Sequence, residues 1–459
     1  MSVKLRLTIM NFLQFFVWGA WLITIGNYWF GTMGWGPTEF GAVFLTLGIA
    51  SLFMPTITGI IADRWINAEK VYAVSHIIAG LAVASFPFIK DPNTFFWVML
   101  LAMSFYMPTI ALTNTVAYNA LSKAKLDVVK NFPPIRVWGT IGFIAAMWFT
   151  NLTGNKASEN MFYISAIASV ILGIYSFTLP KCPPQAKKVG KSSFVELFGL
   201  NAFKLFANYK MAIFFIFSML LGASLQLTNM YGDVFLDEFK YFPLYADSLV
   251  VKRSTIFMSI SQMSETLFIL TIPFFLKRFG IKKVMLLSLF AWVLRFALFG
   301  IGTPTGIGLL FIVLSMIIYG MAFDFFNISG SLFIETETDT KMRGSAQGLF
   351  MMMTNGFGTM IGALGSGYII GKFFTFKFEN IDKLSAHFNA TKDSETIIEF
   401  LKEHGIKVLD SGILDRVAEV RDWPSIWMFF AAFAFVVAVL FMILFKHKHN
   451  PEAIKEIKH

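Results

Sequence analysis

The sequence is poor in charge and nearly devoid of cysteine. Its 459 residues include one cysteine, Cys182, which excludes a disulfide framework and a cysteine-based metal cluster. Charged residues make up 14% of the chain and hydrophobic residues 56%, whereas soluble domains carry about 25% charged residues. A soluble globule of this length could not cover its surface with so few charges. The composition therefore indicates a membrane protein.

Long apolar stretches recur along the chain. A helix needs roughly 20 mostly apolar residues to cross the hydrocarbon core of a bilayer. Twelve stretches are candidates: 7–30, 40–62, 71–88, 94–121, 136–151, 161–179, 211–235, 254–276, 284–300, 306–334, 342–371 and 425–445. The first is too long for a signal-peptide core, and no small-residue cleavage site follows it. The sequence therefore predicts an all-α polytopic protein with twelve transmembrane helices.

The basic residues predict the orientation of these helices. Lysine and arginine accumulate in the short cytoplasmic loops of membrane proteins. If the N-terminus is cytoplasmic, 23 of the 38 basic residues lie on the cytoplasmic side and five in the opposite short loops. Both termini are therefore expected in the cytoplasm. This asymmetry accounts for the net charge of +10 without a nucleic-acid partner.

Two long connections divide the chain. We expect a six-helix bundle over 1–179, a basic cytoplasmic linker over 180–210, and a second six-helix bundle over 211–459 that includes a cytoplasmic tail. The second bundle also contains a polar outer segment, 372–424, in which the stretch SETIIEFLKEH looks helical. A small external cap is the simplest interpretation of this segment, because outer loops tolerate insertions.

Each half carries a short basic turn after its second span. The first reads GIIADRWINAEKVY and the second PFFLKRFGIKKVM. Transporters of the major facilitator superfamily carry a glycine-acid-basic turn at these places, and Gly59, Asp63 and Arg64 fit the first part of that pattern. The resemblance implies the major facilitator fold, with a substrate site near the bilayer midplane between the two bundles.

Polar side chains inside the fifth span suggest a transport pathway, because ionisable groups are costly in a membrane and usually face a cavity. Arg136, Thr140 and Phe143 lie at i, i+4 and i+7, on one helical face. The alternative for Arg136 is that it extends to the cytoplasmic headgroups from a helix end. In the third span His76 is more simply a structural hydrogen-bonding group.

The seventh and eighth spans each present a polar pair at i, i+3 spacing. The pairs are Gln226 with Asn229 and Gln262 with Glu265. Amides in membrane helices often only join neighbouring helices, with an energy of about 0.6–2 kcal/mol. That role could explain one pair, but it explains less well a C-terminal half in which the seventh, eighth and tenth spans all carry polar groups.

The tenth span combines aromatic rings with an acid. Tyr319, Phe323 and Asn327 form a stripe with Asp324 beside it. Aromatic rings can stack on a planar solute and amides can bind its polar edges, so a neutral, partly flat substrate is indicated. Burial disfavours a charged carboxylate, so Asp324 and Glu265 are candidate proton-coupling groups. Alternatively, Asp324 is a fixed partner of a cation such as Arg136.

Several long strings resemble the nucleoside:proton symporters of the major facilitator superfamily. They include NFLQFFVWGAWL, VVKNFPPIRVWGTIGF, SISQMSETLFILTIPFFL, AFDFFNISGS and SAQGLFMMMTNGFG. The resemblance implies uptake of a nucleoside such as uridine with protons across a bacterial inner membrane, by a carrier that works as a monomer without a cofactor. It also implies that ten residues bind substrate or couple protons: Arg136, Thr140, Phe143, Gln226, Asn229, Gln262, Glu265, Tyr319, Phe323 and Asp324.

Other functions remain open at this stage. A carrier for another neutral polar solute, such as a sugar or a nucleobase, would use the same amides. A membrane receptor would bind a ligand without net flux. An enzyme is not expected, because the sequence has no paired histidines on a helix, no catalytic cysteine context and no phosphate-binding loop.

Overall fold

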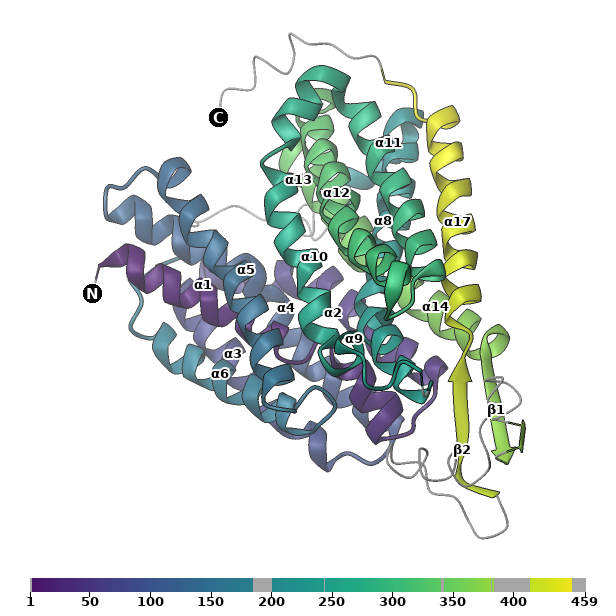
Figure 1. The fold of residues 1–459 in the computed structure, drawn as a ribbon. Helices are drawn as coiled ribbons and strands as arrows, with labels where there is room; N and C mark the ends of the chain where they lie inside the picture. Colours follow the sequence, from purple (N-terminus) through teal and green to yellow (C-terminus); the bar gives the residue numbers. More distant parts are fainter. Residues whose placement is uncertain are drawn as a thin grey trace.

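The computed structural model describes residues 2–184, 200–242, 244–339, 342–380, 382–383 and 413–447. Figure 1 shows two helical bundles, one from residues 2–184 (the N-terminal half) and one from residues 200–447 (the C-terminal half). The N-terminal half contains α1 (Val3–Gly19), η1 (Asn27–Thr32), α2 (Pro37–Arg64), α3 (Ala68–Ala84), η2 (Phe86–Phe88), α4 (Pro92–Lys123), α5 (Val128–Leu152) and α6 (Asn160–Ser176).

The C-terminal half is longer and less regular. Its helices are η3 (Leu200–Ala207), α8 (Tyr209–Glu238), η4 (Phe239–Tyr241), α9 (Leu249–Lys252), α10 (Ser254–Ile269), α11 (Ile272–Ile301), α12 (Gly306–Glu337), α13 (Arg343–Met351), η5 (Met352–Gly358), α14 (Thr359–Phe373) and α17 (Trp423–Leu444). Its two strands are β1 (Thr375–Asn380) and β2 (Ile413–Arg421).

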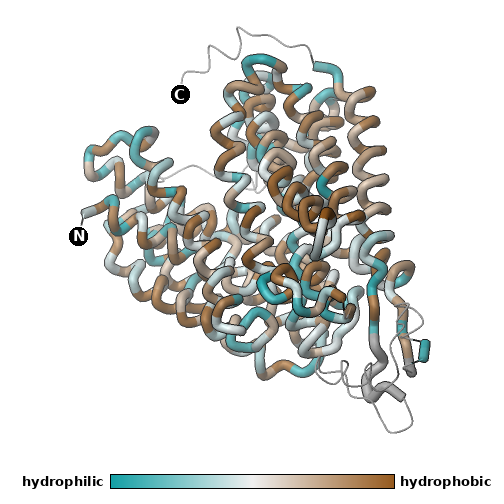
Figure 2. Tube along the Cα trace, viewed as in Figure 1, coloured by the Kyte–Doolittle hydropathy of each residue, from teal (hydrophilic) through white to brown (hydrophobic). Residues whose placement is uncertain are grey.

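The helices have the surface of a membrane protein. Seven helices of the described chain are long and apolar enough to cross a bilayer, and large hydrophobic side chains such as Phe429, Phe433 and Ile443 of α17 are exposed. Figure 2 shows hydrophobic residues along most helices and hydrophilic ones mainly at their ends. A mostly helical membrane protein is therefore confirmed. The count of twelve crossings stays a prediction.

The helix of the fifth predicted span begins earlier than expected. The span was predicted over 136–151, but α5 starts at Val128 and contains Pro133 and Pro134. The carboxylate of Asp127 accepts a hydrogen bond from the Lys130 backbone N–H at 3.2 Å and caps the earlier turn. Arg136 therefore lies well inside the helix rather than at its end.

The eighth predicted span is interrupted, whereas the turn between the eighth and ninth spans lies where the sequence predicted it. The stretch 254–276 was expected to be one helix, but α10 ends at Ile269 and α11 begins at Ile272. The chain turns again at Gly280, whose φ of 77° lies in the left-handed region that glycine tolerates. This second turn coincides with the basic turn predicted from PFFLKRFGIKKVM.

The expectation of an all-α chain is wrong for part of the outer segment. β1 and β2 pair antiparallel, with Thr375 opposite Arg421 and Phe376 opposite Val420. The two strands lie at one end of the molecule, beside α14 and α17 (Figure 1). The stretch 394–404, which looked helical in sequence, lies outside the described residues.

Helices α8 and α14 pack closely, and this packing depends on glycine, which has no side chain, at the point of contact. A Cβ atom at Gly362 would lie 2.6 Å from the carbonyl oxygen of Ala223, which is closer than real Cβ contacts. A Cβ at Gly365, on the same helix, would meet no heavy atom of the described residues within 4 Å. Glycine at 362 therefore allows the two backbones to approach.

We expect Gly362→Ala to lower the free energy of unfolding by about 1–3 kcal/mol, the usual cost of overpacking. Gly365→Ala is the matched control and should be neutral or stabilising by up to about 1 kcal/mol, because alanine favours a helix. Denaturation of both variants in mixed detergent micelles measures the difference. Equal stability of the two variants would show that α8 and α14 do not pack as described.

Candidate substrate site between the two halves

Arg136 of α5 faces the other half of the protein. The guanidinium of Arg136 lies 4.2 Å from the ring centre of Phe15 on α1. Arg136 also interacts electrostatically with Glu265 of α10, across the boundary between the halves. Thr140 and Phe143 are partly buried on the same helix, one and two turns further on. Arg136 is therefore directed towards the opposite bundle rather than only towards a membrane surface.

The C-terminal half contributes buried polar atoms that have no partner. Gln226 Nε2, Gln262 Oε1 and Asp324 Oδ2 are buried, yet none of them has a hydrogen-bond partner among the described residues. Most buried polar groups in proteins are hydrogen-bonded, so such atoms need an explanation. They come from α8, α10 and α12. A polar solute between these helices would satisfy them.

Close contact between α10 and α12 brings the acids and the tyrosine together. A Cβ at Gly320 would lie 2.5 Å from the carbonyl oxygen of Ser264, so glycine allows the two backbones to touch. Glu265 consequently lies within electrostatic range of Tyr319 and Asp324. Tyr319 and Asp324 are each 5% exposed. The structure therefore gathers a cation, two acids and a phenol from α5, α10 and α12.

The remaining predicted residues lie on the same helices as Gln226 and Asp324. Asn229 and Phe323 are partly buried on α8 and α12. Within the described chain no hydrogen bond or ion pair joins any two of the ten predicted site residues. Asp324 lies within electrostatic range of Glu265 rather than pairing with Arg136. The site is thus a set of side chains held by their helices and not by bonds to one another.

A buried network inside the N-terminal half explains His76. Its Nε2 lies 2.8 Å from Gln14 Oε1, and its Nδ1 lies 3.1 Å from Ser169 Oγ. Gln14 Oε1 also accepts a hydrogen bond from Tyr72 at 2.7 Å. These contacts connect α1, α3 and α6. The expected structural role of His76 is confirmed.

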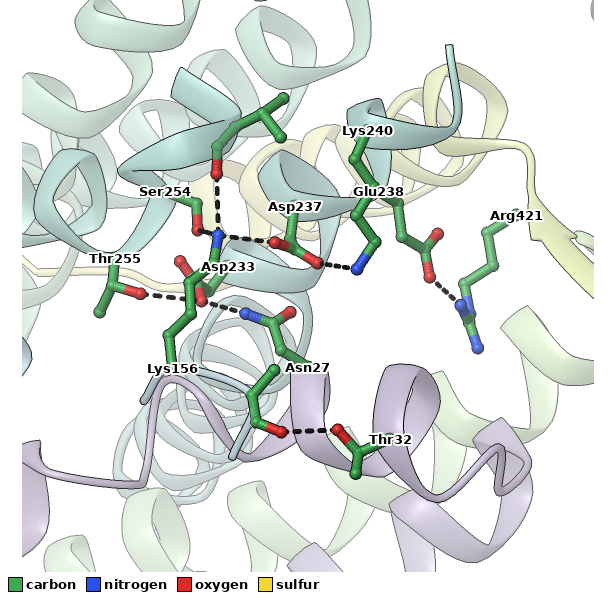
Figure 3. Close-up of polar contacts among 12 residues, drawn as sticks. Asn27, Thr32, Lys156, Asp233, Asp237, Glu238, Lys240, Ser254, Thr255 and Arg421 are labelled. Carbon is green, nitrogen blue, oxygen red and sulfur yellow. Dashed lines mark hydrogen bonds and ion pairs between the residues drawn. The ribbon is translucent and has the colours of Figure 1, made fainter. Parts of the chain in front are cut away.

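The two halves are held together at one end, near α9, and spread apart towards the opposite end, where α13 lies (Figure 1). Asn27 Nδ2 donates to Asp233 Oδ2 at 2.6 Å, and the Lys156 ammonium lies 2.6 Å from Asp237 Oδ1 (Figure 3). Every hydrogen bond or ion pair between the halves, within the described residues, lies at this end. We call it the closed end.

The outer segment also reaches the closed end. Arg421 of β2 pairs with Glu238 (Figure 3). Its guanidinium also lies 3.7 Å from the ring centre of Phe30 in the N-terminal half. Glu238 accepts a further hydrogen bond from Trp423 Nε1 at 2.7 Å. Sequence reasoning missed these groups. The signal available was the acidic run at the end of α8, where Asp233 and Asp237 stand at i, i+4.

These features define a class of protein. Two helical bundles with polar side chains between them, in contact at one end and separated at the other, describe a membrane carrier whose substrate site lies between its two halves. Comparison with known proteins narrows the class to one family.

Residues 1–401 match the family described as Nucleoside H+ symporter. The chain is 47% identical to the nucleoside permease NupG of Escherichia coli (strain K12), over 98% of this chain and 97% of that protein. It is 46% identical to the xanthosine permease of the same organism, over 99% of each. A crystal structure of nucleoside transporter NupG matches with a TM-score of 0.82 and 47% identity, covering 98% of this chain and 100% of that chain. The chain belongs to the nucleoside H+ symporter family.

Asp237→Asn should loosen the closed end. The change removes the carboxylate shared by Lys156 and Lys240, each 2.6 Å away, and a hydrogen bond to a charged group contributes about 1.5–3 kcal/mol. The reporter is Val234→Cys in a Cys182→Ser background, because Val234 is 1% exposed and faces Gly26 of the other half. We expect a maleimide to label this cysteine about tenfold faster in Asp237→Asn. A loss of about 1.4 kcal/mol from the free energy of opening this end raises the open population tenfold.

The control for this experiment is Asp247→Asn. Asp247 is 96% exposed in its ion pair with Lys252, within the C-terminal half. Its replacement should leave the labelling rate unchanged. An unchanged rate in Asp237→Asn as well would show that its ion pairs do not hold the halves together.

Proposed function

We propose that this chain binds a nucleoside such as uridine between its two halves and carries it inward with protons across a bacterial inner membrane. Proton-coupled nucleoside uptake is the function of the family to which the chain belongs. The observation that supports the proposed site best is the set of unpartnered buried atoms on Gln226, Gln262 and Asp324. Amide and carboxyl groups in this arrangement suit ribose hydroxyls and base edges.

The aromatic side chains would hold the planar base. Phe143 belongs to α5 of the N-terminal half, and Tyr319 and Phe323 belong to α12 of the C-terminal half. Stacking of a base on an aromatic ring contributes about 1–3 kcal/mol in single-strand binders. Thr140 and Asn229 would add hydrogen bonds at the edges of the site, and Arg136 would contact the substrate from the N-terminal half.

Asp324 and Glu265 would couple protons to substrate movement. Asp324 has an unpartnered oxygen and lies within electrostatic range of Glu265, and two nearby carboxylates resist being charged together. We assign the coupling proton to Asp324, with Glu265 as a substrate contact that can also titrate. Repeated exposure of this pair to the two sides would load a proton outside and release it inside.

The topology completes the proposal. Twelve helices in two six-helix bundles, 1–179 and 211–459, would cross the membrane, with the linker 180–210 and both termini in the cytoplasm. The excess of lysine and arginine on that side supports this orientation. The closed end, which carries β1 and β2, would then face outward. We propose a monomer that acts as a carrier and not as an enzyme.

Uptake of labelled uridine into proteoliposomes tests the function. An inward proton gradient should drive accumulation, and other nucleosides should block it. Competition by sugars or nucleobases alone would favour a carrier for those solutes. Binding of uridine without net flux would instead identify a receptor.

A further inference from the structure

Arg295 of α11 is a buried cation for which the transport scheme above has no role. It is 0% exposed, and it is the only arginine among the largest fully buried side chains of the described residues. Its Nη1 donates to the carbonyl oxygen of Ser315 at 2.9 Å and to Ser261 Oγ at 3.3 Å. Ser315 Oγ donates in return to the Arg295 carbonyl oxygen at 2.9 Å. One side chain thus connects α10, α11 and α12.

The guanidinium is also stacked against aromatic rings. Its central carbon lies 4.5 Å from the ring centre of Tyr319 and 5.1 Å from that of Phe299. No carboxylate forms an ion pair with Arg295 within the described chain, and its Nε and Nη2 have no hydrogen-bond partner there. A buried charge without a carboxylate is costly, so the rings supply much of its compensation.

Both neighbours of Arg295 adjoin the proposed substrate site. Tyr319 is one of the proposed stacking rings, and it lies one helical turn after Ser315 on α12. Ser261 immediately precedes Gln262 on α10. The planar fork of arginine can stack on one ring and bond to two helices at once, which the ammonium of lysine cannot do.

We infer that Arg295 is a positioning residue for substrate specificity: it fixes the ring of Tyr319 and the adjacent turn of α10 in the geometry that binds the nucleoside. It touches the ring and the helix rather than the substrate. The inference rests on the proposed function, because it assumes that Tyr319 contacts the nucleoside.

The experiment compares Arg295→Lys with Arg278→Lys in reconstituted full-length protein. Arg278 lies 5.7 Å from the ring centre of Phe279 at the turn before Gly280, away from the site, so it is the matched control. We expect Arg295→Lys to raise the KM for uridine uptake about tenfold, while kcat changes little. Misalignment of the Tyr319 ring would weaken substrate binding, and a tenfold weaker affinity corresponds to about 1.4 kcal/mol of binding free energy. Arg278→Lys should change neither constant.

Tyr319→Leu, alone and combined with Arg295→Lys, separates this inference from the proposed site. Tyr319→Leu should raise KM on its own. Adding Arg295→Lys to it should raise KM no further, because the ring that Arg295 positions is gone. If Tyr319→Leu leaves KM unchanged, the proposed substrate site fails. If Tyr319→Leu raises KM but Arg295→Lys lowers only kcat or thermal stability, the site stands and the positioning role is wrong.

A milder change covers the case in which Arg295→Lys does not fold. Ser261→Ala removes one acceptor of the guanidinium and little volume. It should raise KM about threefold without changing kcat, because the guanidinium loses this longer hydrogen bond but keeps the one to the Ser315 carbonyl oxygen. An unchanged KM in this variant would overturn the inference in the same way.

Discussion

Asp324→Asn should abolish gradient-driven accumulation of uridine while leaving exchange of internal for external uridine partly intact. Asparagine has nearly the shape of a protonated aspartate but cannot release a proton. The carrier can still change sides with substrate bound, which exchange requires, but a proton gradient no longer drives the cycle. Asp324 is buried and carries an unpartnered oxygen beside Glu265, so its loss removes the group that we assign to coupling.

The measurement is uptake and counterflow in the same proteoliposomes, with and without an inward proton gradient. Asp247→Asn makes the same chemical change on a 96% exposed side chain and should behave as wild type. Normal accumulation by Asp324→Asn would remove this residue from the coupling scheme. Loss of both accumulation and exchange would mean that Asp324 is needed for substrate binding or folding instead.

Glu265→Gln should weaken uridine binding about 10- to 100-fold. A carboxylate accepting from a ribose hydroxyl makes a charge-assisted hydrogen bond of about 1.5–3 kcal/mol, and each 1.4 kcal/mol is a factor of ten. The change also leaves Arg136 without the carboxylate that it faces across the two halves. Calorimetric titration of the purified protein with uridine measures the loss.

Titration with 2′-deoxyuridine identifies the contact. If Glu265 binds the 2′-hydroxyl, wild-type protein prefers uridine and Glu265→Gln loses most of that preference. Glu159→Gln, on an exposed residue before α6, is the control and should keep both affinity and preference. An undiminished preference in Glu265→Gln would place the ribose elsewhere and leave Glu265 as a proton-coupling group alone.

Local sequence patterns predicted the helical membrane character of the chain and several of its buried polar positions. Tyr319 and Asp324 were expected on one inward-facing helix, and both are buried there. Arg136, expected to share a face with Thr140, does lie within α5. These predictions succeed because the length of an apolar stretch and its helical periodicity depend only on residues close together in the sequence. A single helix has both properties before it packs against others.

Contacts between distant segments were not predictable in this way. Asn27 and Asp233 are 206 residues apart, and Lys156 meets Asp237 only because the two bundles converge at the closed end. The pairing of β1 with β2 joins strands on either side of a long insertion. Sequence spacing does not predict such long-range contacts, because each one depends on how separate segments pack against one another.

Composition and span length alone therefore identify a helical membrane protein and draw attention to its buried polar residues, because lipid imposes the same requirements on every crossing segment. The packing of α10 and α11 against α12 decides that Arg295 stacks on Tyr319, and the contact between the halves decides which end is closed. Both depend on side chains that meet only after the helices have assembled.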